Sequence, residues 1–284
     1  YRFKLNKFTL LTQSDFHQLF NQFENFNIKS NQNSFFILPK IGLDWVINNK
    51  NKITTSYLYN TTNASVLDLY PGYVQTGYRS FTKGFEEFNQ LNSSNASLNY
   101  NYGNWGDKFF VNTFIVYSKN YNFFSTNSTI AQNYSLIDKI IIKDRESLMM
   151  FSNFDYYFKS IKTNFKANFG VTKINFKNIV NNSTLREIKN LKNTYEFELR
   201  SGFRSFFNYH IGTKWDFNQV KNTIVNSYTN NVSFLDLSFM FSDKFNIQLQ
   251  SERYYFSNLS KNYNKYYFLD LETCYVIKEN KLTF

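Results

Sequence analysis

Long stretches of this chain alternate between apolar and polar residues. From Ile161 to Val171 the odd positions are mostly apolar and the even positions mostly polar. A period of two over this length indicates an extended strand with one apolar and one polar face. The same alternation recurs in Tyr195–Arg200, Leu235–Phe241 and Phe245–Gln250. The pattern therefore predicts an all-β chain.

The alternation predicts thirteen strands, joined in turn by short and long connections. The expected strands are 2–12, 38–48, 52–61, 94–103, 107–118, 147–158, 161–172, 193–204, 207–217, 231–241, 244–255, 265–277 and 281–284. Short turns are expected near 49–51, 104–106, 160, 205–206, 242–243 and 278–280, with long connections at 13–37, 62–93, 119–146, 173–192, 218–230 and 256–264. This order is typical of an antiparallel up-and-down transmembrane β-barrel, with tight periplasmic turns and long outer loops. Loops 62–93 and 119–146 are expected to project outward.

The alternative fold is a soluble β-sandwich or a run of extracellular repeats, because alternation does not say which face is outside. Sandwich strands are usually five or six residues long, shorter than those expected here. Aromatic residues near the expected strand ends also suit the interfacial girdles of a membrane barrel. These are Tyr57, Tyr59, Tyr156, Phe158, Trp215 and Phe217. Both observations favour the barrel.

Composition agrees with a wall that meets lipid on one side and water on the other. Aromatic residues make up 21% of the chain, with 34 Phe and 22 Tyr, yet charged residues reach 19%. No apolar run is long enough for a membrane helix, which strands do not need. The net charge is +11, but Lys and Arg are scattered, which favours solvated loops and a wet lumen over a nucleic-acid partner. The single cysteine, Cys274, excludes a disulfide framework within the chain.

The alternation assigns individual residues to the two faces of the wall. The lipid-facing residues are expected to be Phe165, Phe169, Phe197, Leu199, Leu237, Phe239, Ile247, Leu249, Leu269 and Leu271. The lumen-lining residues are expected to be Lys166, Glu196, Glu198, Arg200, His210, Lys214, Asp236, Gln248, Asp270 and Glu272. The charged members of the second set form either a salt-bridge ladder that stiffens the wall or a lining that contacts a plug or a passing solute.

No pattern of catalytic residues is present. His17 and His210 are far apart, and neither has metal-ligand spacing with a cysteine or another histidine. Glu86 and Glu87 are adjacent, so their side chains point apart in an extended chain. We therefore expect no enzyme activity, no metal and no cofactor.

Several segments resemble the barrels of TonB-dependent receptors, and most closely those of Bacteroidota. One is Phe36–Trp45, followed by a turn at Asn49–Lys52 and by Ile53–Tyr57. A second consists of Leu69–Tyr73, Thr76–Phe81 and Lys83–Gly84, which resembles an outer-loop passage of the same group. A third pairs Tyr266–Leu271 with Lys278–Phe284, which is similar to the penultimate hairpin. The resemblance spans nearly the whole chain, on strand-and-turn patterns of moderate specificity.

The resemblance implies that residues 1–284 are one segment of a 22-stranded barrel in the bacterial outer membrane, matching about strands nine to twenty-one. Since Tyr1–Leu5 already alternate, the chain is expected to begin within a strand. Family members hold an N-terminal plug, couple import to TonB and in many cases partner with a surface lipoprotein. The implied function is import of a large or scarce solute. A non-transporting scaffold in a larger surface or secretion assembly and a passive porin remain alternatives.

Overall fold

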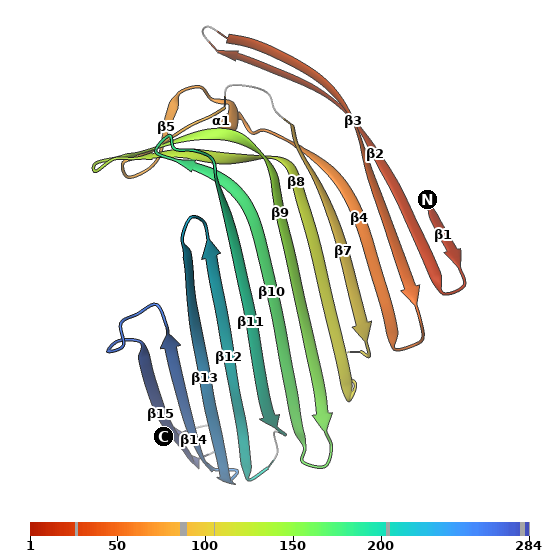
Figure 1. The fold of residues 1–284 in the computed structure, drawn as a ribbon. Coiled ribbons are helices and arrows are strands. Elements are labelled where there is room, and N and C mark those ends of the chain that lie inside the picture. Colours follow the sequence, from red (N-terminus) through yellow and green to blue (C-terminus); the bar gives the residue numbers. More distant parts are fainter. Residues whose placement is uncertain (26–27, 86–89, 105, 203–204, 279–281, 284) are drawn as a thin grey trace.

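The described residues form one curved antiparallel sheet. The computed structural model describes residues 1–284 except 26–27, 86–89, 105, 203–204, 279–281 and 284. Its elements are β1 Arg2–Leu5, β2 Phe8–Asn25, β3 Ile28–Val46, β4 Asn51–Asn63, α1 Val66–Leu69, β5 Tyr73–Gly77, β6 Ser80–Lys83, β7 Gln90–Tyr102, β8 Phe109–Ile130, β9 Ser135–Phe158, β10 Thr163–Val180, β11 Arg186–Ser201, β12 Phe207–Lys221, β13 Val225–Ser242, β14 Phe245–Phe256, β15 Lys265–Lys278 and β16 Leu282–Thr283. Neighbours in the sheet follow chain order, with β5 and β6 off the main path (Figure 1).

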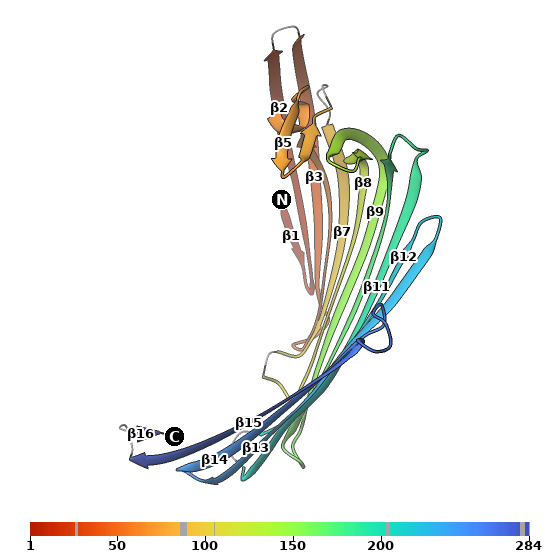
Figure 2. The same ribbon diagram turned by 90° about the vertical axis from the view of Figure 1, so that its left-hand side faces the viewer.

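The architecture is a single layer rather than two packed sheets. Leu237 and Leu249, which would face each other across the core of a sandwich, are directly opposed on neighbouring strands β13 and β14. Figure 2 shows the sheet edge-on as one bowed wall. Among the described strands, β1 and β16 lie at opposite edges and do not pair with each other, so the sheet is open. The up-and-down antiparallel prediction is confirmed for this sheet.

The prediction of a single strand over residues 2–12 was wrong. Residues 2–12 divide into β1 and the start of β2, joined by a turn at Asn6 and Lys7. Asn6 has a φ of 52°, a left-handed conformation that asparagine tolerates better than most residues. The other short turns connect β3 to β4, β7 to β8, β9 to β10, β11 to β12 and β13 to β14, and they lie at the same end of the sheet as this one (Figure 1).

The segments expected to be long loops are largely strands as well. The predicted number of strands, thirteen, was therefore too low, and the predicted strands were too short. Among the described residues there are sixteen, and β8 and β9 run for 22 and 24 residues. Of the expected loop 119–146, only 131–134 connects two strands, while 62–93 holds α1, β5 and β6. Alternation disappears where successive residues are alike, as in the polar run 31–34 of β3 and the apolar run 140–142 of β9, although the backbone ladder continues. The hydrophobic pattern therefore ended before the strands did.

The hairpin of β8 and β9 turns over part-way along its length. Near the short turns β9 lies between β8 and β10, with Phe165 of β10 paired to Tyr156 of β9. At the other end β8 pairs in parallel with β10, at Asn127 and Ile179, while β9 pairs in parallel with β6. The two strands thus exchange places beside β10. The ladder is irregular between the two halves, at Asp144, whose φ is 64°. Figures 1 and 2 show the far halves of β8 and β9 arching over the sheet.

Helix α1 docks against this arched region. Ser65 caps the helix and Asp68 completes the capping box. Asp68 also forms an ion pair with Lys139 of β9. Gly84 passes so close to the end of α1 that an added Cβ would lie 2.6 Å from the Asp68 carbonyl oxygen. A side chain at position 84 would therefore push the two segments apart.

The arched region also contains most of the small core. The buried hydrophobic residues among those described are Leu69, Phe123, Ile142, Ala167 and Ile188. Only Ala167 lies in the lower part of the wall, whereas Phe123 and Ile142 are opposed just beyond the crossing of β8 and β9. The rest of the sheet thus has two accessible faces and no interior.

Candidate functional site

The cross-strand register places all ten residues expected to face lipid on one face of the sheet. Directly opposed residues in an antiparallel pair share a face, and alternate residues along a strand return to it. Phe165 is opposed to Leu199, which is opposed to Ile211, and that row continues through Leu235. Leu237, Leu249 and Leu271 form a parallel row. In β10–β15 this face carries the odd-numbered residues, and we call it the odd-numbered face.

The ten residues expected to line the lumen lie on the opposite, even-numbered face. One row crosses five strands through Arg200, His210, Asp236, Gln250 and Asp270. The register also sets Lys166 against Glu198, Glu196 against Lys214 and Gln248 against Glu272. The structure separates the two sets of side chains completely. Which face meets lipid remains a prediction.

His210 lies at the centre of a polar cluster on the even-numbered face. Its Nε2 is 3.1 Å from a Glu198 carboxylate oxygen, and its Nδ1 is 3.5 Å from Asp236. The ring also packs edge-on against Phe234, with centroids 4.7 Å apart. Because the two ring nitrogens point to carboxylates on different strands, they do not converge on a common metal position. The contacts hold the imidazole between two acceptors and are part of a ladder of charged groups.

A cavity of about 310 Å³ opens beside this cluster. It brings together four of the ten expected lumen residues, which are Arg200, His210, Asp236 and Gln248. Glu196 lies further along β11, where it accepts a hydrogen bond of 3.3 Å from the Asn168 amide. The cluster offers charges of both signs and amide groups, which suits hydrogen bonding to a polar solute or to another protein segment.

The expected set omitted an aromatic group on the same face. Tyr254, Phe256, Tyr266 and Phe268 line a second cavity of about 470 Å³, together with Gln250, Glu252 and Asp270. The Tyr254 and Phe268 rings meet edge-on at 5.7 Å, and the Tyr254 hydroxyl donates to Glu252 at 2.7 Å. The sequence signal is the run of consecutive aromatics at 254–256 and at 266–268, which places rings on both faces of β14 and β15.

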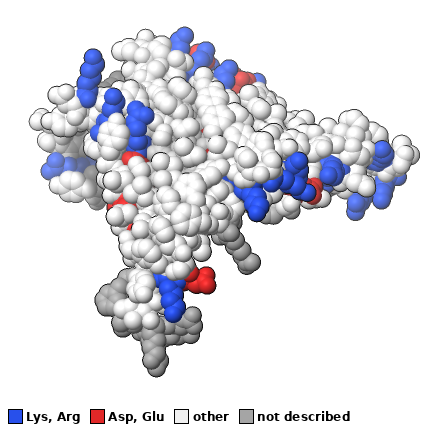
Figure 3. Space-filling view, turned by 90° about the horizontal axis from the view of Figure 1, so that it is seen from below, with Lys and Arg blue, Asp and Glu red and all other residues white. Residues whose placement is uncertain are grey.

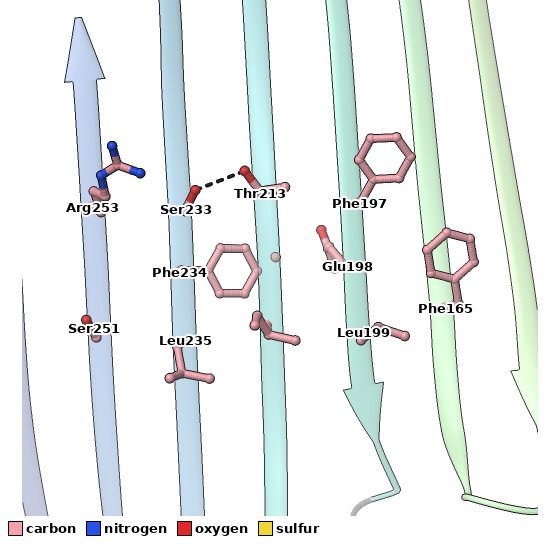
Figure 4. Close-up of a pocket in the computed structure, with 12 residues that line it drawn as sticks. Phe165, Phe197, Glu198, Leu199, Thr213, Ser233, Phe234, Leu235, Ser251 and Arg253 are labelled. Atoms are coloured by element: carbon pink, nitrogen blue, oxygen red, sulfur yellow. Dashed lines mark hydrogen bonds between the residues drawn. The ribbon is translucent and has the colours of Figure 1, made fainter.

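On the odd-numbered face, a groove of about 490 Å³ crosses β10–β14 (Figure 4). Phe165, Phe197, Leu199 and Leu235 supply its apolar lining, and the hydroxyls of Thr213 and Ser233 are 2.9 Å apart at its upper rim.

Behind the groove, the next residue on β12, Gly212, has no side chain on the even-numbered face. An added Cβ there would lie 2.5 Å from the ring of Phe234, a residue of the even-numbered face. Phe234 and Glu198 therefore contribute to a groove on the other side of the sheet.

Aromatic residues line both ends of the odd-numbered face. Near the short turns, Phe8 stacks on Trp45 at 5.4 Å, and Phe109 meets Tyr156 at 6.1 Å. Towards the other end, Tyr195 contacts both Phe169 and Phe217. By register, Tyr57, Tyr59, Tyr156, Phe158, Trp215 and Phe217 all lie on this face. Their role as interfacial girdles stays a prediction.

Catalytic and metal-binding groups were not expected, and the described residues contain no group of three His, Cys, Asp or Glu that could hold a metal ion. His17 lies on β2, far from His210 on β12. Glu86 and Glu87 lie outside the described residues. In the described part of the chain, no helix is long and apolar enough to cross a membrane.

Comparisons with known proteins bear on the fold. No family model and no curated protein matches the chain. The siderophore receptor PirA from Acinetobacter baumannii is similar in structure, with 11% identity and a TM-score of 0.51 over 97% of this chain. The chain spans 42% of PirA.

Two further structures are less similar. The ferric-catecholate import receptor Fiu from K12 E. coli has 10% identity and a TM-score of 0.43, covering 99% of this chain and 53% of Fiu. OmpT, an outer membrane protein of Vibrio cholerae, has 7% identity and a TM-score of 0.37, covering 90% of this chain and 89% of OmpT. The chain is thus an antiparallel up-and-down sheet with outer-membrane β-barrel proteins among its structural neighbours.

Proposed function

We propose that this chain forms part of the wall of a β-barrel in the bacterial outer membrane, with the odd-numbered face in lipid and the even-numbered face towards the lumen. The observation that carries the proposal is the cross-strand register of β10–β15. It places all ten residues expected to face lipid on the odd-numbered face and all ten expected to line the lumen on the even-numbered face, with Arg253 of β14 as a charged side chain on the odd-numbered face. In water, an uncovered face carrying Phe197, Leu199 and Leu271 at 37%, 38% and 70% exposure would be costly. Lipid removes that cost.

The height of the apolar band fits a bilayer. On β9 the same face runs from Phe158 to Leu148 and is apolar apart from Ser152. Ten residue steps at about 3.3 Å cover roughly 33 Å along the strand. A strand tilt of about 40° reduces this to about 25 Å, the height of the apolar band of an outer-membrane barrel.

The curvature of the sheet also supports the assignment. An antiparallel residue that exchanges both hydrogen bonds with its opposite neighbour points both its N–H and its C=O towards that neighbour. The Met240 N–H donates to the Phe206 carbonyl, and the Ser257 N–H donates to the Thr229 carbonyl. On β13, the even-numbered residues therefore direct their N–H and C=O groups towards β12, and the odd-numbered residues direct theirs towards β14.

The handedness of L-amino acids then fixes where the side chains point. With β12 and β14 running upward on either side of β13, the odd-numbered side chains point towards the viewer of Figure 1. This is the convex side of the bow in Figure 2, the side that faces lipid in a closed barrel.

We further propose that the wall belongs to a TonB-dependent transporter that imports a large or scarce solute. The sequence resemblance supports this, as does the likeness in fold to the siderophore receptor PirA. The complete barrel would have 22 strands and a plug against the even-numbered face, and TonB and a surface lipoprotein would be its partners. The polar cluster around His210 and the aromatic group of β14 and β15 would then contact the plug or the solute.

Cysteine accessibility tests the membrane assignment. With Cys274→Ser as the background, the chain has no other thiol. Leu199→Cys and Leu249→Cys should be shielded from a water-soluble maleimide, whereas Glu198→Cys and Gln248→Cys should react once the lumen is opened with denaturant. Reaction of Leu199→Cys in intact outer membranes at the rate of an exposed loop cysteine would overturn the assignment.

Single-channel conductance separates the proposed transporter from the alternatives. The protein as it occurs in the outer membrane would be inserted into a planar bilayer. A plugged transporter should conduct only when denaturant displaces the plug. A large steady conductance without denaturant would instead identify a porin. No conductance under either condition, with the protein correctly inserted, would favour a scaffold.

A further inference from the structure

A set of lysines lies just beyond the apolar band, on the odd-numbered face at the end away from the short turns. On β10 the apolar run ends at Val171, and Lys173 follows on the same face. Lys189 of β11 and Lys221 of β12 lie on this face too, beyond Leu191 and Phe217. All three lysines are exposed. We call Lys173, Lys189 and Lys221 the lysine triad.

Two members of the triad face each other in a way that costs energy. The register sets Lys189 directly opposite Lys221 on neighbouring strands. Directly opposed residues have Cβ atoms about 5 Å apart, where like charges destabilise the pairing of two strands. An anion placed between the two ammonium groups would remove this repulsion.

The local carboxylates neutralise only part of the positive charge. Glu187 lies 3.2 Å from the Lys189 ammonium, and Glu146 lies 3.4 Å from Lys119 on the same face. No ion pair of the described residues involves Lys173 or Lys221. The lysine triad and its charged neighbours therefore keep a net positive charge at the level where lipid headgroups begin.

We propose that the lysine triad binds the phosphate of a lipid headgroup in the leaflet nearest the long connections. The acyl chains would lie on the apolar face below, against Phe169, Tyr195 and Phe217, where the Tyr195 ring contacts each of the other two rings. A lipid is favoured over free phosphate because the basic groups adjoin an apolar surface that only an acyl chain would cover. This rests on the proposed assignment of the odd-numbered face to lipid.

Native mass spectrometry of the protein purified from its own membrane tests the proposal. The probes would be dioleoyl phosphatidic acid, dioleoyl phosphatidylcholine and inorganic phosphate. Phosphatidic acid should be retained preferentially. The combined change Lys173→Gln, Lys189→Gln and Lys221→Gln should weaken its binding roughly a hundredfold, at about fivefold per lysine.

Two matched variants control for net charge and for folding. Lys159→Gln, Lys162→Gln and Lys244→Gln remove the same charge from the short-turn end, which Figure 3 shows from below, and should change binding less than about twofold. Replacing the triad with arginine should preserve binding, since the charge remains. Equal losses in both Gln variants, or full competition by inorganic phosphate, would overturn the proposal.

The outcome can be separated from that of the membrane assignment. If Leu199→Cys is shielded from maleimide but the triad variant binds phosphatidic acid as well as the unmodified protein, only the lipid site is wrong. If Leu199→Cys reacts freely, the assignment of the odd-numbered face itself fails.

Discussion

Below the crossing of β8 and β9 the sheet is a bowed wall of one layer. Beyond the crossing, the same two strands form the arched region, which lies over the sheet as a second layer. In the wall, Phe165 pairs with Tyr156 of β9, and side chains alternate strictly between the two faces. In the layer, β8 lies against β10, α1 docks on top, and Phe123 and Ile142 are buried. One continuous hairpin thus has two kinds of environment. The wall has an alternating sequence and the arched region does not, and we expect the two regions to respond differently to substitution.

The largest difference should come from charge placed on the wall. Leu249→Lys would put an ammonium group in the apolar band, which should destabilise the inserted protein by about 2–4 kcal/mol. Gln248→Lys, one residue away on the opposite face, should cost less than about 1 kcal/mol. Urea unfolding of each variant in lipid vesicles would measure both values. Equal costs for the two variants would contradict the two-faced wall.

A smaller effect is expected from adding a side chain at Gly212 of β12. In Gly212→Ala the new methyl group would collide with the Phe234 ring, so we expect a loss of about 1–3 kcal/mol in unfolding free energy. Gly170→Ala is the matched control, because its nearest contacts are at 3.5 Å, an ordinary packing distance. Adding Phe234→Leu to Gly212→Ala should recover part of the loss. No recovery would mean that the backbone contact with the Phe197 carbonyl, at 3.1 Å, decides the cost.

The arched region should be easier to disturb locally without unfolding the wall. Asp68→Asn removes the charge that pairs with Lys139, and we expect α1 and β5–β6 to open more readily by about 1–2 kcal/mol. Hydrogen exchange of residues 66–83 would measure the change, with β11 as the internal reference. Faster exchange in β11 as well would show that the layer and the wall unfold together.

The smallest effect concerns pH. Burial raises the pKa of Asp68, but the hydrogen bonds from Lys139 and Ser65 outweigh it and leave the pKa below its usual value. The stabilisation is therefore complete above the usual value near pH 4 and is lost as pH falls through the lowered pKa. The hydrogen bond to Asp138 raises the pKa of Tyr73, so its contribution is lost only as pH rises through that raised value, above about 10.

The protection of residues 66–83 from hydrogen exchange, relative to the intrinsic exchange rate at each pH, should accordingly be greatest between these limits. Asp68→Asn should remove the acid limb of the profile and leave the alkaline limb in place. An acid limb that persists in Asp68→Asn would assign it to another group.

The sequence predicted the wall well because the wall has two different faces. The register puts the ten residues expected to face lipid on one face and the ten expected to line the lumen on the other, and the assignment of either face to lipid stays a prediction. The split of the first strand at Asn6 was missed because residues 2–12 alternate across the turn. The continuation of β8 and β9 was missed because it does not keep a period of two, as in the apolar run 140–142 of β9. The aromatic group at Tyr254 was missed because its rings break the alternation. The exchange of β8 and β9 depends on contacts distant in sequence, which no local pattern encodes.

The lack of an interior in the wall has a consequence for how the chain reaches its destination. A soluble domain can fold where it is made because its apolar residues cover one another, but here the odd-numbered face would have only lipid to cover it. The polypeptide would therefore cross any aqueous compartment unfolded, carrying alternating segments such as Ile161–Val171 that readily pair with other strands. A holding chaperone would be needed during that passage, and insertion into the bilayer would itself be the folding step.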